Sequence, residues 1–274
     1  MPDAFNQPDR PDRGDIYAFD EEAIVAPPLP GEVVAVPTFD EVVDRVAADL
    51  VAQAEQCVRQ FGDFHLALSG GRTPQPLYER LMYDPRYRML PWRRTHLWFV
   101  EERCVPFDSP HSNYREISET IGDHSDIPPD QFHPIFAESP TADTDYETQI
   151  REALEWREKG HDRLDFVLLT LGADGHTAGL FPFDEALDEN KRWMRRIRCT
   201  DVDPSERVTM TLPFINAARF VAVLAGGYSK AEAVQRLAYG EESPREFPIK
   251  GVEPIAGELM WYLDSEACGQ VMGE

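Results

Sequence analysis

The fold is decided by residues 64–74, which have the sequence FHLALSGGRTP. Phe64–Leu68 is a short apolar run of the kind that forms a buried strand. Two glycines then interrupt the run, and Pro74 stands where a helix can begin, because the first helical position needs no backbone N–H. Apolar residues recur at helical spacing from there to Leu81. The stretch therefore predicts a strand, a glycine-rich turn and a helix in succession.

The same alternation recurs along the rest of the chain. Val33–Val36 suits a first strand, and Thr38 with Glu41 forms a capping box at the start of a helix. We expect further strands at Thr95–Val100, Leu164–Leu171, Val208–Leu212, Arg219–Leu224 and Leu259–Leu263, and helices from Ser112, over Asp143–Lys159 and from Ser229 with a capping box to Glu232. Alternating strands and helices predict an α/β fold with a mostly parallel sheet covered on both faces. In such folds ligands bind beyond the carboxyl ends of the strands.

Length and charge limit the class of protein. The chain has 274 residues, of which 42% are hydrophobic, so a sizeable core can form. We expect residues 1–30, rich in Pro, Asp and Arg, to be an extended or disordered arm, and residues 31–274 to form a single α/β catalytic domain. The formal net charge of −23 repels nucleic acid and anionic membranes. It also repels a phosphorylated ligand, so a phosphate site has to be a local cationic pocket.

The cysteines and the apolar runs indicate a cytoplasmic protein. Cys57, Cys104, Cys199 and Cys268 lie far apart and lack zinc-ligand spacing, so we expect reduced thiols and no metal. The N-terminus has no apolar, cleavable signal. The longest apolar runs are far too short to span a bilayer.

The glycine-rich turn at residues 69–74 is the first candidate site. Gly70 and Gly71 let the backbone approach a ligand, and the following helix directs free N–H groups towards it. Arg72 and Thr73 can add donors. The turn therefore fits a phosphate cradle, and equally an ordinary connection between a strand and a helix. It is not a G-x-S-x-G elbow, so Ser69 is a poor candidate for a nucleophile.

A second glycine-rich turn, residues 172–179, holds the most reactive pair of side chains. A very apolar strand precedes it and delivers Asp174 and His176. Histidine is the side chain best suited to accept a proton near neutral pH, and a nearby carboxylate fixes its tautomer. We expect His176 to act as a general base supported by Asp174. The alternative is a histidine that only stabilises the turn.

Four further residues could complete a site. Glu101 and Arg103 follow the strand Thr95–Val100. They could bind sugar hydroxyls or orient a catalytic group, or simply form a solvated charge cluster. Arg207 begins a strand, so it reaches the site only if the preceding loop folds over the sheet edge. Lys230 is expected in the first turn of a helix, where a cation is unfavourable unless a phosphate binds beside it. A tolerated surface lysine is the alternative.

These loops, in this order, resemble the glucosamine-6-phosphate isomerase/6-phosphogluconolactonase family. The resemblance extends from about residue 33 to about residue 268 and includes Leu68–Pro74, Glu102–Pro106, Gly172–Pro182, Arg207–Thr211, Gly226–Gly227 and Trp261–Asp264. It implies a three-layer, Rossmann-like α/β fold of the sugar-phosphate isomerase/lactonase type. It also implies hydrolysis of 6-phosphoglucono-δ-lactone, a small-molecule sugar phosphate of the pentose phosphate pathway, without a metal or another cofactor.

By this resemblance each candidate residue has a role. His176 activates water, and Asp174 supports or orients the His176 side chain. The phosphate is held by Gly70, Gly71, Arg72, Thr73 and Lys230, and the substrate is also bound by Glu101, Arg103 and Arg207.

Two departures separate the branches of the family. The family usually has Asp-Glu-Arg where this chain has Glu101-Glu102-Arg103, and its isomerase members carry a Glu shortly after the histidine, where this chain has Leu180-Phe181-Pro182. Both differences favour lactone hydrolysis over isomerase chemistry. An amino-sugar-phosphate isomerase or deaminase and a non-catalytic sugar-phosphate-binding protein stay as alternatives, and the sequence leaves the oligomeric state open.

Overall fold

The computed structural model describes residues 24–270, so most of the predicted N-terminal arm lies outside the described residues. Residues 24–30 form neither a helix nor a strand, yet they contact the domain. Trp261 Nε1 donates a hydrogen bond to the carbonyl of Pro30 at 2.6 Å, and Val25 N donates to Gln270 Oε1 at 3.3 Å. Within the described part of the chain, no helix combines the length and apolar character that a membrane crossing requires.

A seven-stranded sheet forms the centre of the described region. Every pairing in it is parallel. Across the sheet the strands are β1 (Glu32–Val36), β10 (Glu258–Asp264), β9 (Phe220–Ala225), β6 (Phe166–Thr170), β2 (Phe64–Leu68), β3 (Thr95–Phe99) and β5 (Phe132–His133). Strands β2, β6 and β9 are buried along almost their whole length, which explains their unbroken apolar sequences.

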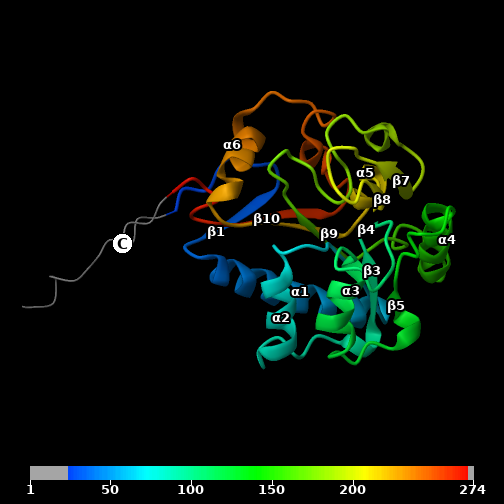
Figure 1. The fold of residues 1–274 in the computed structure, drawn as a ribbon. Coiled ribbons are helices and arrows are strands. Elements are labelled where there is room, and N and C mark those ends of the chain that lie inside the picture. Colours follow the sequence, from blue (N-terminus) through cyan, green and yellow to red (C-terminus); the bar gives the residue numbers. More distant parts are fainter. Residues whose placement is uncertain (1–23, 271–274) are drawn as a thin grey trace, which may run out of the picture.

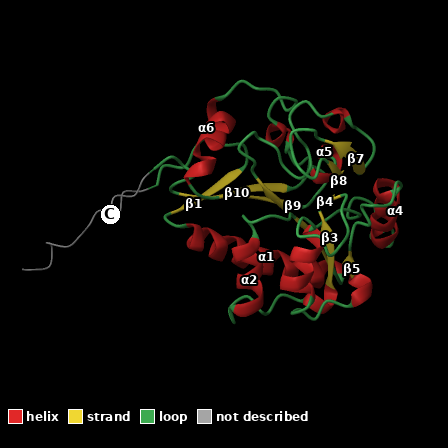
Figure 2. Ribbon diagram, in the orientation of Figure 1, coloured by secondary structure: helices red, strands yellow, loops and turns green. Residues whose placement is uncertain are grey.

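Helices cover both faces of this sheet. The α-helices are α1 (Phe39–Phe61), α2 (Gln75–Tyr83), α3 (Asn113–Ile117), α4 (Ala142–Leu154), α5 (Leu212–Ile215) and α6 (Ala231–Tyr239). Figure 1 shows α1 and α2 on one side of the sheet and α6 on the other, and Figure 2 shows the strands between these helices. The predicted three-layer α/β fold with a mostly parallel sheet is confirmed.

The longest helix, α1, follows the sequence signals closely. The Thr38 hydroxyl accepts a hydrogen bond from Glu41 N at 3.2 Å, which confirms the predicted cap. Gly62 ends the helix in a left-handed conformation with a φ of 94°, where a side chain would be strained. The face that carries Val43, Leu50 and Ala54 is buried against the sheet. The capping signals therefore fix both ends of α1.

A second, smaller sheet is antiparallel and has the order β4 (Glu101–Arg103), β8 (Glu206–Met210), β7 (Met194–Arg198). The strand predicted at Val208–Leu212 is therefore two residues too late, because Leu212 already begins α5. Strands β4 and β7 were not predicted from the sequence. β4 is three residues long and charged throughout, and β7 contains three arginines, so neither shows an apolar strand pattern.

Two helix predictions are wrong in detail. The capping box from Ser229 to Glu232 is absent: residues Tyr228–Lys230 form a 3-10 turn, and α6 begins after Lys230 without a side-chain cap. The entry to this turn is fixed instead by Asp264, which accepts a hydrogen bond from Gly227 N at 2.8 Å. The helix predicted over Asp143–Lys159 ends at Leu154, and beyond it Arg157 turns into the interior.

At the amino ends of the central strands lies a stack of three histidines, of which His65 and His133 are buried and His96 is partly buried. The ring of His96 stacks between those of His65 and His133, and the Trp98 ring stacks on His133 with 3.8 Å between ring centroids. Gln149 Nε2 donates to His133 Nδ1 at 3.3 Å, so His133 Nε2 carries the proton and donates to His96 Nδ1 at 3.0 Å. Burial, together with the neighbouring histidines, lowers the pKa of His96 to about 4 and that of His133 to about 3.

This stack predicts an acid-sensitive fold. A histidine whose pKa is lowered in the folded state stays neutral there while the unfolded chain takes up protons. Its contribution to stability is complete above about pH 6.5 and is lost as the pH falls towards the folded-state pKa. In urea unfolding, His133→Gln should reduce the loss of unfolding free energy between pH 7 and pH 4.5 by on the order of 2 kcal/mol. An equal loss in the variant and the wild type would contradict this account.

Candidate active site

The predicted site residues meet at the carboxyl ends of the parallel strands. A cavity of about 310 Å³ opens there. Its lining includes the predicted residues Gly70, Gly71, Arg72, Thr73, Glu101, Arg103, His176, Arg207 and Lys230, together with Ser69, Thr170, Leu171, Gly172, Ala173, Ala178, Phe181 and Val202. The remaining predicted residue, Asp174, does not line the cavity but contacts His176. The structure therefore brings every predicted site residue to one place.

His176 and Asp174 form a hydrogen-bonded pair. His176 Nδ1 lies 2.5 Å from Asp174 Oδ1, and the same oxygen accepts a hydrogen bond from His176 N at 3.1 Å. Burial acts to raise the pKa of the Asp174 carboxyl, but its hydrogen bonds and charge interaction with His176 outweigh burial and lower this pKa below 3.8. Asp174 is therefore a carboxylate that accepts the Nδ1 proton. This leaves Nε2 as the basic nitrogen of a ring that lines the cavity.

The turn that carries this pair is held by close packing. A Cβ at Gly172 would lie 2.1 Å from His176 Nδ1, so only glycine leaves room for the ring. Gly175 has a φ of 85°, and its carbonyl accepts a hydrogen bond from Ile249 N at 2.9 Å. The His176 ring stacks on Phe181, with 4.8 Å between ring centroids. The orientation of His176 is thus set from two sides.

The glycine-rich loop after β2 combines structural and open donor groups. Ser69 is buried, and its hydroxyl donates to the Leu168 carbonyl at 2.8 Å, which agrees with its rejection as a nucleophile. Gly71 has a φ of 94°, and its N–H donates to Glu116 Oε2 at 3.2 Å. Within residues 24–270, the N–H groups of Arg72 and Thr73 form no hydrogen bond. These two donors are available to an anion.

The smaller sheet supplies Glu101 and Arg207 as a buried ion pair. Arg207 lies within β8, and its Nη1 donates to Glu101 Oε2 at 3.0 Å and to Oε1 at 3.3 Å. The Arg207 guanidinium also lies over the Phe181 ring, 5.2 Å from the centroid. Arg207 therefore reaches the cavity from inside a strand of the second sheet, and not through the loop over the sheet edge that the sequence analysis required.

Two further cations approach the cavity separately. Arg103 Nη1 donates to the His111 carbonyl at 3.1 Å and also to Asn113 Oδ1. Lys230 forms no hydrogen bond or ion pair with the described residues through its side chain. Burial lowers the pKa of its amine below 10.5, and the negative charge of Asp174 acts in the opposite direction. Lys230 therefore combines a cation with partial burial beside the His176–Asp174 pair.

Three residues that were not predicted as site residues also contribute to the site. Gly172 has a role because of the space that it leaves for His176, Val202 lines the cavity from the segment before β8, and Asn113 bonds to Arg103. The sequence signals for them are slight: Gly172 begins the predicted glycine-rich turn at residues 172–179, and Asn113 follows the predicted helix start at Ser112. None of the three has a distinctive spacing or a reactive group, so the sequence does not single them out.

Two other features could be mistaken for functional sites. Asp63, His65 and His96 bring possible metal-ligand atoms within 4.8 Å of one another. However, the two rings are stacked at 7°, so their lone pairs run parallel and do not converge, and Asp63 already pairs with Arg157 at 2.5 Å. These contacts favour a structural role.

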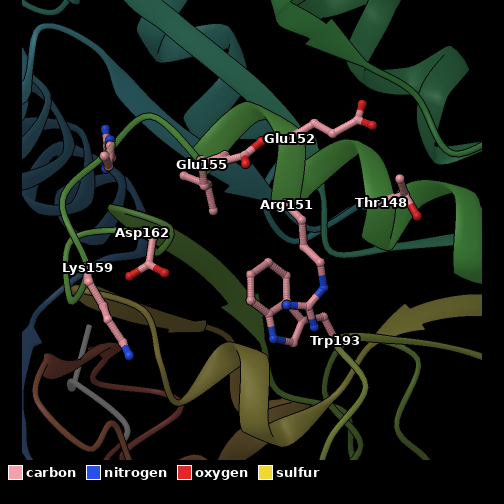
Figure 3. A pocket seen from close by; sticks show the side chains of 9 residues that line it. Thr148, Arg151, Glu152, Glu155, Lys159, Asp162 and Trp193 are labelled. Carbon is pink, nitrogen blue, oxygen red and sulfur yellow. The ribbon is translucent and has the colours of Figure 1, made fainter.

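A larger hollow of about 690 Å³ lies beside α4 (Figure 3). Arg151 covers the Trp193 ring there and also pairs with Glu147 at 2.7 Å. The hollow is lined by neither histidine nor glycine-rich loops. Its chemistry is therefore that of a surface groove, and we place the site at the smaller cavity.

Comparison with known proteins identifies the family. Residues 37–261 match the family described as glucosamine-6-phosphate isomerases/6-phosphogluconolactonase. This chain belongs to that family. The family contains both isomerases and lactonases, so membership alone does not choose the reaction.

Individual relatives add detail. The chain is 36% identical over 82% of its length to a protein named 6-phosphogluconolactonase from Synechocystis, and the match covers 92% of that protein. It is also 36% identical over 83% of its length to the human GDH/6PGL endoplasmic bifunctional protein, but spans only 29% of that relative. The crystal structure of 6-phosphogluconolactonase from Thermotoga maritima superposes with a TM-score of 0.72 and 28% identity, covering 85% of this chain and 99% of the other.

The buried Glu101–Arg207 pair gives a testable stability difference. Both side chains are 9% exposed, so Glu101→Ala would leave an uncompensated buried guanidinium. We expect this variant to lose about 3–5 kcal/mol of unfolding free energy in urea titrations. The matched control is Glu119→Ala, which breaks the exposed pair with Arg115 and should cost about 1 kcal/mol or less. Similar losses in the two variants would refute a buried, mutually dependent pair.

Proposed function

We propose that this protein hydrolyses 6-phosphoglucono-δ-lactone to 6-phosphogluconate in the oxidative branch of the pentose phosphate pathway, with His176 as the general base. The observation that carries the proposal is the His176–Asp174 pair at the wall of a cavity that also contains four cationic side chains. A base beside a cationic cavity fits an anionic substrate that needs an activated water. The relatives named 6-phosphogluconolactonase support the same reaction.

The tautomer of His176 suits this chemistry. Because Asp174 accepts the Nδ1 proton, Nε2 is free to take a proton from water. The resulting hydroxide forms a bond to the lactone carbonyl carbon, and the carbonyl oxygen takes up the negative charge. When the tetrahedral intermediate collapses, the bond between the carbonyl carbon and the ring oxygen breaks. His176 returns its proton to that ring oxygen, and Asp174 stabilises the imidazolium between the two steps.

Binding of the phosphate would place the lactone for this attack. The free N–H groups of Arg72 and Thr73 and the side chains of Arg72 and Lys230 are donors that suit a phosphate. Arg103 and Arg207 add positive charge on the other side of the cavity. Positioning of this kind can supply much of a rate enhancement, because the reacting groups no longer have to find each other. The proposed reaction needs no cofactor, since a lactone is already an activated ester.

The isomerase alternative fits the site less well. Glu101 occupies the position of the aspartate that is expected to move protons in the isomerases, but both of its carboxylate oxygens bond to Arg207. Phe181 packs on His176 where those enzymes carry an acid. We therefore propose that glucosamine 6-phosphate is not turned over. A cytoplasmic location belongs to the same proposal.

The first test is the rate of lactone hydrolysis above the spontaneous rate, with the lactone generated in place by glucose-6-phosphate dehydrogenase. His176→Ala should lower kcat by about 10²–10⁴, the range for loss of a general acid–base group. His124→Ala, which changes an exposed histidine that does not line the cavity, serves as the control. Wild-type protein that binds 6-phosphogluconate without accelerating hydrolysis would instead identify a non-catalytic sugar-phosphate-binding protein.

Lys230 tests the phosphate end of the cavity. Lys230→Met keeps the apolar length of the side chain and removes the charge. We expect KM for the lactone to rise by about tenfold or more, with a smaller change in kcat, because a charged hydrogen bond to the phosphate is lost. Inhibition by inorganic phosphate should weaken in parallel. A fall in kcat alone, with KM and phosphate inhibition preserved, would remove Lys230 from phosphate binding.

A further inference from the structure

We infer that Asn113 is a positioning residue that fixes the glycine-rich loop and Arg103 relative to each other and so sets the width of the phosphate-binding part of the cavity. The inference rests on the proposed function. Asn113 does not line the cavity itself. It acts through the two groups that do.

The amide of Asn113 is completely buried and bonded to β4. Its Nδ2 donates to the Glu101 carbonyl at 2.9 Å, and its Oδ1 accepts from Arg103 Nη1. A buried amide with both ends engaged has one orientation, because rotation would place two donors or two acceptors together. The position of Arg103 is therefore tied to the first residue of α3.

The same amide occupies the space beside Gly70. A Cβ at Gly70 would lie 1.9 Å from Asn113 Oδ1 and 2.2 Å from its Cγ. A glycine is therefore required at position 70 because the Asn113 side chain lies so close. From the sequence, this glycine was expected to make room for a ligand. One oxygen atom thus touches the two sides of the cavity, the loop through Gly70 and the smaller sheet through Arg103.

Two buried or partly buried acids hold α3 in this position. Glu102 accepts hydrogen bonds from Asn113 N at 2.9 Å, Tyr114 N at 2.7 Å and the Ser112 hydroxyl at 3.1 Å, which fastens the start of α3 to β4. Glu116, in the next turn, accepts the Gly71 N–H at 3.2 Å. The helix is therefore attached to both walls, and Asn113 lies between them.

This arrangement separates substrate positioning from proton transfer. Loss of the Asn113 amide would let the loop and Arg103 move apart, which weakens phosphate binding because the donors are no longer preorganised. The His176–Asp174 pair belongs to the turn after β6, which Asn113 does not contact through a hydrogen bond. We therefore expect an effect on KM and not on proton transfer.

The experiment compares Asn113→Ala and Asn113→Asp with Ser112→Ala. The aspartate keeps the shape of the side chain and the oxygen that accepts from Arg103. It replaces the N–H donor to the Glu101 carbonyl by a second carboxylate oxygen, and it places a negative charge beside Arg103. Ser112→Ala removes the cap of α3 and a bond to Glu102, so it loosens the helix without touching Gly70 or Arg103. The measurements are KM, kcat, the inhibition constant of inorganic phosphate and Tm.

Both Asn113 variants should raise KM and the phosphate inhibition constant together by about tenfold, while kcat stays within about threefold of wild type. Ser112→Ala should lower Tm but change KM and phosphate inhibition by less than about twofold, because Asn113 N and Tyr114 N keep their hydrogen bonds to Glu102. The inference is overturned if KM changes by less than about twofold in Asn113→Ala, or if Ser112→Ala raises KM equally.

Two provisions keep the test decisive. If Asn113→Ala does not fold, Gly70→Ala replaces it, since the added Cβ displaces the amide and should give the same parallel change. If wild-type protein does not hydrolyse the lactone, the proposed function fails by itself. Calorimetric titration with inorganic phosphate then tests Asn113 separately, and equal affinity in wild type and Asn113→Ala would overturn the positioning role.

Discussion

The site depends on one constraint, which is that parallel strands end at the same edge of a sheet. Strands β9, β6, β2 and β3 are neighbours in the sheet, so the segments that follow them emerge side by side. With strands about 4.8 Å apart, groups separated by more than a hundred residues in sequence come within reach of one small molecule. The glycine-rich loop, His176 and Lys230 all reach the cavity in this way. The order of the buried strands brings these segments together, and the glycines of the loops then allow their close packing.

The electrostatics of the cavity differ from those of the molecule. The chain carries a formal charge of −23, yet Arg72, Arg103, Arg207 and Lys230 all line this one cavity. Salt screens charges beyond about 8 Å, so the many surface acids matter less to a bound anion than these four neighbours. Glu101 cancels part of this charge by pairing with Arg207. Arg72, Arg103 and Lys230 form no ion pair with a described residue, so their charge stays available to a bound anion.

The large sheet and the residues of the site were predicted from the sequence better than the strands and side chains that hold these residues in place. Strands β6 and β9 consist almost entirely of apolar residues, and α1 has a capping residue at each end. The structure agrees with these local signals. The strands β4 and β7 have no such signal, because charged residues make up all of β4 and most of β7. The pairing partner of β4, strand β8, is also distant from it in sequence. Ser229 does not cap α6, and the turn before this helix is instead held by Asp264 at the end of β10, which accepts a hydrogen bond from Gly227 N. The same limit applies to Asn113, whose importance comes from close contacts across three segments and not from its own chemistry.

Each of the two sheets provides a different part of the site, and this division affects how the site can change in evolution. The turn after β6 in the large sheet provides the His176–Asp174 pair, whereas Glu101, Arg103 and Arg207 come from the antiparallel sheet. Substitutions in the small sheet can therefore alter the lining of the cavity while His176 and Asp174 stay in place. A lineage could exchange substrates by small steps in β4 and β8 without passing through an inactive ancestor.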